Sequence, residues 1–214
     1  NAGQKCSACS LLLVERSVYN SEEFKTKLID CATSLKVGSV WDAGNIVGPM
    51  ITNKNEKLLH ALEHLEPGES WLVAPRFVDK KRYILAPTIK WGVKPGSYSF
   101  RTELFGPMLS VCPFDTLDEA ISLVNGLDYG LTSGIQSLDE KEQEKWKNSI
   151  MAGNLYINRG ITGAIVNRQP FGGMKLSAFG GGIKAGGPNY CSLFTYITDK
   201  PGSKTDYKKS YAEA

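Results

Sequence analysis

The sequence predicts an α/β fold built on a parallel sheet, and three features of its second half indicate this. Apolar runs typical of strands alternate with helical segments, the connections are short, and the helices begin at capping residues. Strands joined by short helical crossovers pair in parallel, with the helices packed on the sheet. The alternating elements are strands at 108–114, 131–137 and 154–158 and helices at 116–126 and 139–150.

The first half opens with a strand and a helix. The run Leu11–Glu15 is apolar enough for a buried strand. Ser21 can cap the helix, and the acidic residues that follow it complement the N-terminal dipole. We expect this helix to stop at Gly38. Its apolar positions recur at helical spacing, namely Phe24, Leu28, Cys31 and Leu35.

A second helix carries the two histidines of the chain. Asn53 and Glu56 have the spacing of a capping box, which predicts a helix that starts there and ends at Pro67. The spacing of His60 and His64 matches a zinc-peptidase helix. Both nevertheless project from the solvated side, opposite an apolar face of Leu58, Ala61, Leu62 and Leu65. We therefore expect an exposed amphipathic helix and no metal site.

Shorter elements complete the pattern. Strands are expected at 70–73, 82–86 and 192–197, and loops at 42–49 and 94–101. The glycine-rich segment 159–182 leaves the strand at 154–158 at its carboxyl end, where parallel sheets place functional loops. It reads either as a mobile surface loop or as backbone that approaches a ligand closely. The tail from Asp199 is polar, and we expect it to be frayed.

Composition limits the function classes. The chain has 214 residues, 42% of them hydrophobic and 22% charged, as in an ordinary globular domain. Its net charge of +3 is too small to indicate a nucleic-acid or membrane partner, and no apolar run is long enough to span a bilayer. Five cysteines without metal spacing, Cys6 and Cys9 among them, indicate free thiols and a cytoplasmic location.

Cys6 is the candidate nucleophile. The cation of Lys5 lowers the proton affinity of a neighbouring thiol, and the strand that follows would hold the cysteine rigidly. A half-buried structural cysteine is the alternative. A cysteine protease would need a histidine base, and the only histidines, His60 and His64, lie on the solvated face of a helix.

Three motifs in this order resemble the aldehyde dehydrogenase superfamily, and both their order and their separations fit. They are Gly3-Gln4-Lys5-Cys6-Ser7, Glu103-Leu104-Phe105-Gly106-Pro107 and Gln169-Pro170-Phe171-Gly172-Gly173. Two further stretches, 158–166 and 184–190, look like the dehydrogenases that oxidise glutamate semialdehyde, also called pyrroline-5-carboxylate dehydrogenases. That activity occurs alone or as the second half of bifunctional proline utilisation A.

The resemblance implies an architecture and partners. It implies a catalytic domain over residues 1–197, with a doubly wound, mostly parallel sheet, and a flexible tail over 198–214. It also implies NAD as cofactor and assembly into a homo-oligomer. The family's dinucleotide-binding half precedes the catalytic cysteine. We therefore expect this chain to be a catalytic fragment that is inactive without that half.

The resemblance also implies roles for individual residues. Cys6 would add to the aldehyde, Glu103 would accept hydrogen bonds from the nicotinamide ribose hydroxyls, and Phe105 would pack beside the nicotinamide ring. The substrate would be recognised by Ser7, Gly163, Ala164 and Phe171. A surface ion pair is the alternative role for Glu103, and simple core packing is the alternative for Phe171.

Two other functional readings remain open. In the first, the chain belongs to a dehydrogenase of another aldehyde, including one that forms a thioester with coenzyme A. In the second, it is an inactive module. Such a module would serve an assembly through its sheet and the expected strand at 192–197.

Overall fold

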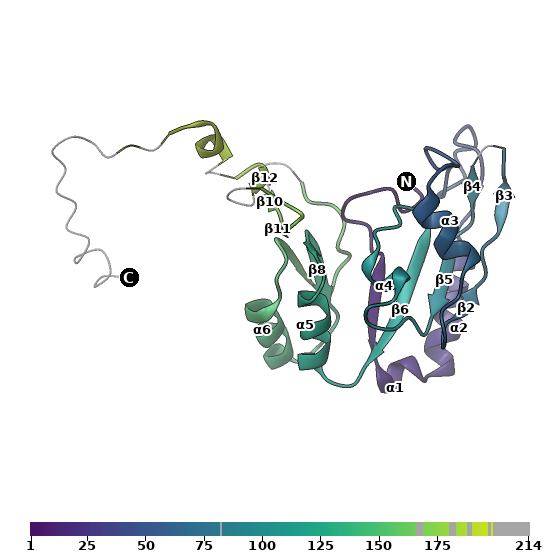
Figure 1. The fold of residues 1–214 in the computed structure, drawn as a ribbon, viewed down its shortest axis with the longest axis horizontal. Helices are drawn as coiled ribbons and strands as arrows, with labels where there is room; N and C mark the ends of the chain where they lie inside the picture. The colour runs from purple at the N-terminus through teal and green to yellow at the C-terminus, as the bar shows by residue number, and fades with distance from the viewer. Residues whose placement is uncertain (82, 166–168, 180–182, 188–189, 197, 199–214) are drawn as a thin grey trace.

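The computed structural model describes residues 1–81, 83–165, 169–179, 183–187, 190–196 and 198. It consists of a four-stranded sheet with its helices and a separate parallel strand pair with two further helices (Figure 1). Two of the three pairings in the larger sheet are parallel, so the predicted α/β class with mostly parallel strands is confirmed. Among the described residues, no helix combines the length and apolar character that crossing a membrane would require.

The larger sheet has the strand order β1-β6-β5-β2. β1 (Leu11–Glu15) and β5 (Thr88–Trp91) flank β6 (Met108–Phe114) in parallel, and β2 (Ser70–Val73) pairs with β5 in antiparallel orientation. The sequence predicts β1, β2 and β6 but not β5. Every residue of β5 is buried, yet Thr88 and Lys90 break its apolar run, so the usual signal of a buried strand is missing.

The strands divide their side chains between two helical layers, as the alternation of a β-strand requires. Leu12 and Val14 face α1 (Arg16–Tyr19) and α2 (Glu22–Thr33), whereas Leu11 and Leu13 face the side covered by α4 and α5. α4 spans Tyr98–Arg101 and α5 spans Leu117–Asn125. The sheet is therefore covered on both faces.

α2 begins as predicted but ends early. The Ser21 hydroxyl accepts from the amide of Phe24 at 3.3 Å, which confirms the N-cap. The helix ends at Thr33 with Ser34 as C-cap, so the predicted stop at Gly38 is wrong. The chain turns back here, because the amide of Gly38 donates to the carbonyl of Val47 at 3.0 Å.

α3 spans Glu56–Glu63, and its N-cap is Asn55 rather than the predicted Asn53. It ends at Glu63, well short of Pro67, because the backbone at His64 is already extended. The buried face that was predicted is present at Leu58, Ala61 and Leu62, but Leu65 lies beyond the helix and is 45% exposed. This face packs on the ends of β4 and β6.

The second half folds around a parallel pair of strands. β8 (Thr132–Ile135) and β9 (Asn154–Ile157) pair in parallel, and α5 and α6 (Glu140–Ser149) pack on them, as predicted from the alternation. The expectation that β6 shares this sheet is wrong. α5 lies between the two sheets, because its Leu123 packs against the four-stranded sheet while its Ile121 packs with Trp146 of α6.

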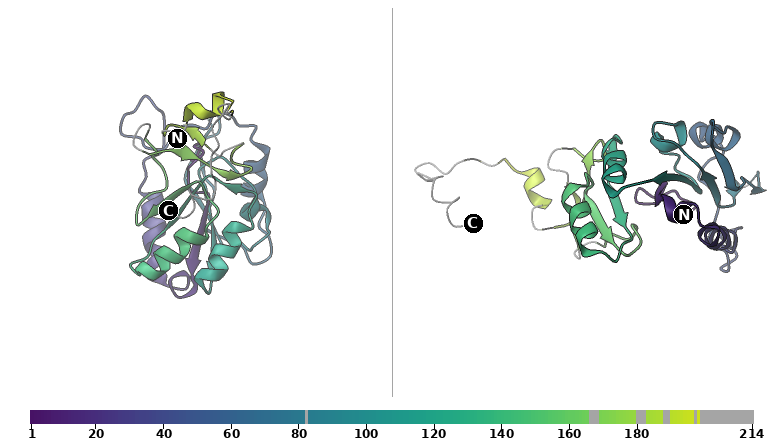
Figure 2. Two further views of the ribbon diagram at one scale, coloured as in Figure 1. Left: turned by 90° about the vertical axis from the view of Figure 1, so that its left-hand side faces the viewer. Right: turned by 90° about the horizontal axis from the view of Figure 1, so that it is seen from below.

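The remaining elements are short. β3 (Phe77–Asp79) pairs with β4 (Ile84–Leu85), β7 (Tyr129–Gly130) pairs with β11 (Met174–Lys175), and β10 (Phe171–Gly172) pairs with β12 (Ile183–Ala185). The right-hand view of Figure 2 shows the green segment with α5 and α6 between the purple-to-blue part and the yellow end.

Three sequence predictions fail or go untested in these elements. The predicted strand at 192–197 is wrong, because Tyr190–Phe194 forms a 3₁₀ helix, η1, and Ile197 lies outside the described residues. The predicted loop at 94–101 ends in the helical turn α4. The predicted frayed tail, 199–214, also lies outside the described residues.

Candidate active site

Cys6 lies in a turn ahead of β1. The amide of Ala8 donates to the carbonyl of Lys5 at 2.9 Å and closes the turn, with Cys6 exposed at its centre. We expected the strand that follows Cys6 to hold the thiol rigidly. Instead Cys6 and Cys9 are both exposed in turn and coil residues, and both are free thiols. The nucleophile is thus accessible, and its position depends on what holds the turn.

Gln4 holds this turn against a distant segment. Its side-chain Oε1 accepts from the amide of Ile51 at 2.7 Å, and its Nε2 donates to the carbonyl of Asn1 at 2.9 Å. The sequence places Gln4 in a motif but assigns it no role. The sequence signal for such a role was an amide side chain two residues before the candidate nucleophile, because this group can donate and accept hydrogen bonds at once.

The Cys6 turn is also in backbone contact with the turn that carries Glu103. Gly3 has a φ of +70°, and a Cβ atom there would lie 2.0 Å from the carbonyl oxygen of Gly106. No other residue type fits this approach. Two motifs about a hundred residues apart in sequence are therefore packed together, which is what a shared site requires.

Glu103 and Phe105 both point to solvent from this second turn. Leu104 between them is buried at 4% exposure, and it anchors the turn in the core formed by α3. Phe105 is 42% exposed and has a φ of +49°, a strained value for a bulky side chain. Glu103 enters none of the ion pairs formed among the described residues, so the surface salt bridge weighed as its alternative role is not found there.

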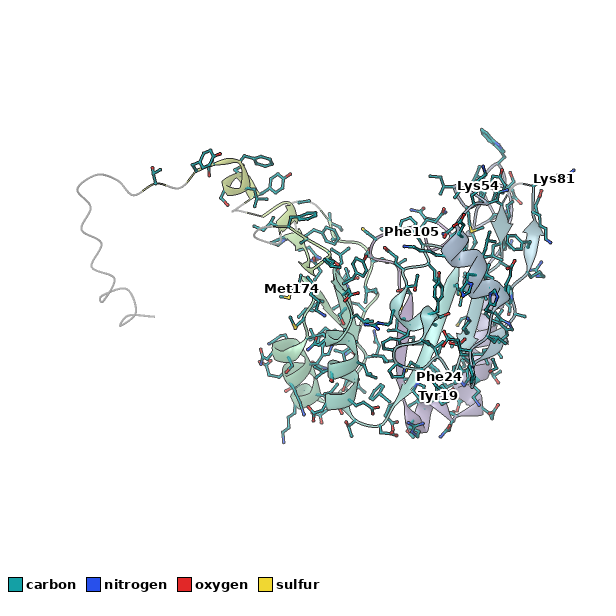
Figure 3. All side chains as sticks on the ribbon, viewed as in Figure 1. Tyr19, Phe24, Lys54, Lys81, Phe105 and Met174 are labelled. Carbon is teal, nitrogen blue, oxygen red and sulfur yellow. The ribbon has the colours of Figure 1, made fainter. Side chains whose placement is uncertain are left out.

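The site occupies the amino end of the parallel strands. Cys6 precedes β1 and Glu103 precedes β6, and the two strands run in the same direction. Figure 3 shows Phe105 at the opposite end of this part of the molecule from Tyr19 and Phe24. The rule that functional loops follow the carboxyl ends of strands, applied above to segment 159–182, does not describe these two motifs.

An open hollow of about 520 Å³ adjoins the two turns. Gln4 and Phe105 line one side of it, and the connector between α2 and α3 lines the rest. That connector presents both apolar and polar groups to the hollow, among them Val40, Asp42, Asn45, Ile46, Pro49 and Ile51. Such a surface can contact a flat ring and polar substituents together.

Ser7 faces inward although it follows the exposed Cys6. It is 4% exposed, so the two neighbouring side chains have opposite surroundings. Of the residues expected to recognise the substrate, Ser7 is the one that shares a turn with the nucleophile, as its neighbour in sequence.

Gly163 and Ala164 lie on the segment after β9. Gly163 has a φ of +96°, a value that favours glycine, and a Cβ atom there would have no neighbour within 4 Å. Both residues are half-buried, with open space around the glycine. Residues 166–168 of the same segment lie outside the described residues.

Phe171 forms part of β10 and is half-buried. Asn154 of β9 holds its neighbours, because Nδ2 donates to the carbonyl of Pro170 at 3.0 Å and Oδ1 accepts from the amide of Gly172 at 3.0 Å. Among the described residues, strand pairing ties Phe171 to β12 and the hydrogen bonds of its neighbours tie it to β9, whereas none of these links it to the Cys6 turn. The structure thus brings Cys6, Ser7, Glu103 and Phe105 together through their two turns, and it holds Phe171 on a separate element.

The histidine pair lies at the carboxyl-terminal end of α3. His60 and His64 are exposed and stack on each other, with ring centroids 4.2 Å apart. Within the described part of the chain, no group of three or more His, Cys, Asp or Glu side chains could hold a metal ion.

Comparison with known proteins places these motifs in one family. The aldehyde dehydrogenase family model matches residues 1–199. A curated 1-pyrroline-5-carboxylate dehydrogenase of Geobacillus sp. (strain WCH70) is 34% identical over 195 residues, which cover 90% of this chain. The chain spans only 37% of the length of that relative.

Solved structures agree on the fold. Proline utilization A (PutA) from Corynebacterium freiburgense superimposes with a TM-score of 0.85 at 41% identity, covering 99% of this chain and 23% of that one. A 1-pyrroline-5-carboxylate dehydrogenase from Thermus with bound NAD gives a TM-score of 0.75 at 34% identity, covering 82% of this chain and 34% of that one.

Proposed function

This chain belongs to the aldehyde dehydrogenase family, and we propose that it carries the nucleophile and the nicotinamide-ribose site of an NAD-dependent dehydrogenase of glutamate semialdehyde, acting in proline catabolism. The observation that supports this most strongly is the contact of Gly3 with Gly106, which packs the Cys6 turn on the Glu103 turn. The relatives named 1-pyrroline-5-carboxylate dehydrogenase support the choice of substrate.

Cys6 performs the covalent chemistry in this proposal. Its thiolate adds to the aldehyde carbon and forms a thiohemiacetal, whose oxygen carries the charge displaced from the carbonyl. In this proposal the backbone N–H of Cys6 donates a hydrogen bond to that oxygen. A turn suits this role better than a strand, because the amide of a ladder residue is already used by its partner strand.

Glu103 and Phe105 have the properties of a nicotinamide-nucleotide site. A carboxylate can accept one hydrogen bond from each of two adjacent ribose hydroxyls, and an aromatic ring can pack on the nicotinamide. Both side chains are exposed on one buried anchor, Leu104, and Phe105 borders the hollow described above. NAD supplies the hydride acceptor that converts the Cys6 adduct into a thioester.

The substrate carboxylate needs an anion site. We assign it to the Ser7 hydroxyl and to the backbone amides at Gly163 and Ala164, with Phe171 against the aliphatic part of the substrate. The left-handed backbone and open surroundings of Gly163 support this role, because neighbouring amides in such a conformation can converge on an anion. Water then releases the acid from the thioester, and in our proposal a glutamate outside the 214 residues activates that water.

The surface supports two further parts of the proposal. All five cysteines are free, as in a reducing cytoplasm, where we place the protein. Large apolar side chains are exposed in the described stretches 169–179 and 190–196, and we assign this surface to assembly with a second copy of the chain. These side chains are Leu176, Phe179, Leu193, Phe194 and Tyr196.

The test uses the protein at its natural length and compares two aldehydes on the Ser7→Ala variant. The catalytic efficiency for glutamate semialdehyde should fall roughly 10- to 150-fold, because a charge-assisted hydrogen bond is lost. Efficiency for an aldehyde of equal length without the carboxylate should hardly change. An equal fall for both would mean that Ser7 supports Cys6 instead of binding substrate. No NADH production by the wild-type protein would overturn the proposed activity.

A further inference from the structure

Asn55 connects α3 with the turn that carries Glu103. Its side-chain Oδ1 accepts from the amide of Leu58 at 3.1 Å and so caps the helix. Its Nδ2 donates to the carbonyl of Leu104 at 2.7 Å, across 49 residues of sequence. One partly buried amide group therefore serves both the start of a helix and the peptide group that joins Leu104 to Phe105.

The peptide that Asn55 holds is the one that directs both side chains. The Leu104 carbonyl belongs to the peptide group that joins Leu104 to Phe105, whose φ of +49° is unfavourable for a bulky residue. A backbone in such a conformation persists only when its surroundings fix it. The hydrogen bond from Nδ2 fixes one side of this peptide plane.

The first turn of α3 secures the other side. Gly106 packs on Leu58 so closely that a Cβ atom on the glycine would lie 2.4 Å from the Leu58 side chain. Leu58 is fully buried, and its amide is the group that Asn55 caps. The helix start and the Glu103 turn are therefore locked together at Asn55 and at Leu58.

We propose that Asn55 is a positioning residue for the nicotinamide-nucleotide site, acting through the Leu104 peptide on Glu103 and Phe105. This inference rests on the proposed function. Asn55 itself contacts neither the reacting atoms nor Cys6. Its loss should weaken cofactor binding while the reactivity of the Cys6 thiol stays unchanged.

The Asn55→Asp variant separates the two hydrogen bonds of this side chain. Aspartate still accepts from the amide of Leu58 and remains a good N-cap. It has no N–H to donate, so the Leu104 carbonyl loses its partner. The matched control is Ser21→Ala, which removes the cap of α2 without touching either turn.

Three measurements on the natural-length protein decide the matter. In Asn55→Asp, amide hydrogen exchange at Phe105 and Gly106 should accelerate, and the Kd for NAD should rise about 3- to 10-fold, as expected for one lost hydrogen bond. The rate of Cys6 alkylation by iodoacetamide should match the wild type. Ser21→Ala should lower the melting temperature but leave both NAD affinity and exchange at these residues unchanged.

Two results would overturn the proposal: unchanged exchange at Phe105 and Gly106 in Asn55→Asp, or accelerated exchange with an unchanged Kd for NAD. A parallel slowing of Cys6 alkylation would also contradict it, because the effect would then extend to the nucleophile. If the wild-type protein bound no NAD, the proposed function itself would fail. The wild-type measurement alone therefore distinguishes that failure from a failure of the Asn55 proposal.

Discussion

Gly3 and Gly106 are in direct backbone contact, with room for no side chain between them: a Cβ atom on Gly3 would lie 2.0 Å from the carbonyl oxygen of Gly106. The contact sets the distance between the turn of the candidate nucleophile and the turn of the candidate cofactor residues. Gln4 and Asn55 reinforce it by binding the two turns to the connector that leads into α3.

Gly3→Ala should disrupt this contact. The added methyl group forces the backbone apart, and the φ of +70° is unfavourable for alanine, so we expect a loss of about 2–5 kcal/mol in the free energy of unfolding. Urea denaturation measures it. Gly160→Ala is the control, because a Cβ atom there would have no neighbour within 4 Å, and it should change stability by less than about 0.5 kcal/mol. Equal stability of the two variants would contradict the packing described here.

The buried Lys90 gives a second prediction about stability. Its Nζ donates to the carbonyl of His64 at 2.8 Å and to the Ser99 hydroxyl at 2.9 Å, and it lies 3.2 Å from a carboxylate oxygen of Glu69. The side chains of Lys90 and Glu69 are 2% and 1% exposed. Lys90→Ala leaves a buried carboxylate without its cation and should cost about 3–5 kcal/mol.

A double-mutant cycle checks the cause of that loss. Glu69 already has one buried oxygen, Oε1, without a hydrogen-bond partner among the described residues. Without the Lys90 cation, its buried negative charge would therefore be poorly compensated. Glu69→Gln removes the charge but keeps an acceptor for the amide of Glu66. The double variant of Glu69→Gln with Lys90→Ala should recover at least about 1 kcal/mol relative to the sum of the two single changes. Strict additivity would mean that the pair is not coupled.

Cys112 predicts how stability depends on pH. Burial raises the pKa of its thiol from 9.0 to about 11, with the charge of Glu119 adding to the effect. Because the folded chain holds this proton more tightly than the unfolded chain, the resulting stability is complete below about pH 9 and is lost as the pH rises through about 11.

The free energy of unfolding should therefore fall by about 2–3 kcal/mol more in the wild type than in Cys112→Ala between pH 8 and 11. The comparison uses denaturant titrations of both proteins across that range. The cavity left by alanine lowers the whole curve but does not change its slope. Parallel curves would mean that the thiol titrates normally.

Glu103→Gln tests the cofactor site. Glutamine keeps the shape of the side chain but has lost the charge that strengthens hydrogen bonds from the ribose hydroxyls, so the first-turnover formation of NADH should slow about 10-fold or more. Stopped-flow absorbance on the natural-length protein measures it. Glu144→Gln, which changes another exposed glutamate on α6, is the control. An unchanged first-turnover rate would remove Glu103 from the site.

Local rules predicted much of the fold from the sequence. Ser21 and Thr116 cap their helices as expected, and β1, β2, β6, β8 and β9 lie where the sequence indicated strands. What failed depends on tertiary structure. The sequence did not indicate β5 because Lys90 breaks its apolar run. The charge of this buried lysine is satisfied by Glu69 and Ser99, which lie outside the strand. β6 does not join the sheet of β8 and β9, because α5 packs on both sheets and separates them.

For the site, too, the local features could be predicted and the tertiary contacts could not. Its motifs can be read from the chain, and their residue types indicate the chemistry. The interactions that unite them cannot be read from it, because Gly3 and Gly106, or Asn55 and Leu104, are related only by the folded backbone. The sequence accordingly placed the cap of α3 at Asn53 and passed over Asn55, whose second hydrogen bond is the long-range one.

The most direct test of the central claim is the Cys6→Ala variant of the natural-length protein, assayed for NADH production from glutamate semialdehyde and for NAD binding by calorimetry. We predict that turnover falls below roughly a hundredth of the wild-type value, because no thiol remains to form the covalent adduct. The Kd for NAD should stay within about 2-fold, since the cofactor residues lie on the separate Glu103 turn. Turnover above that level would contradict the account and make Cys6 a structural residue.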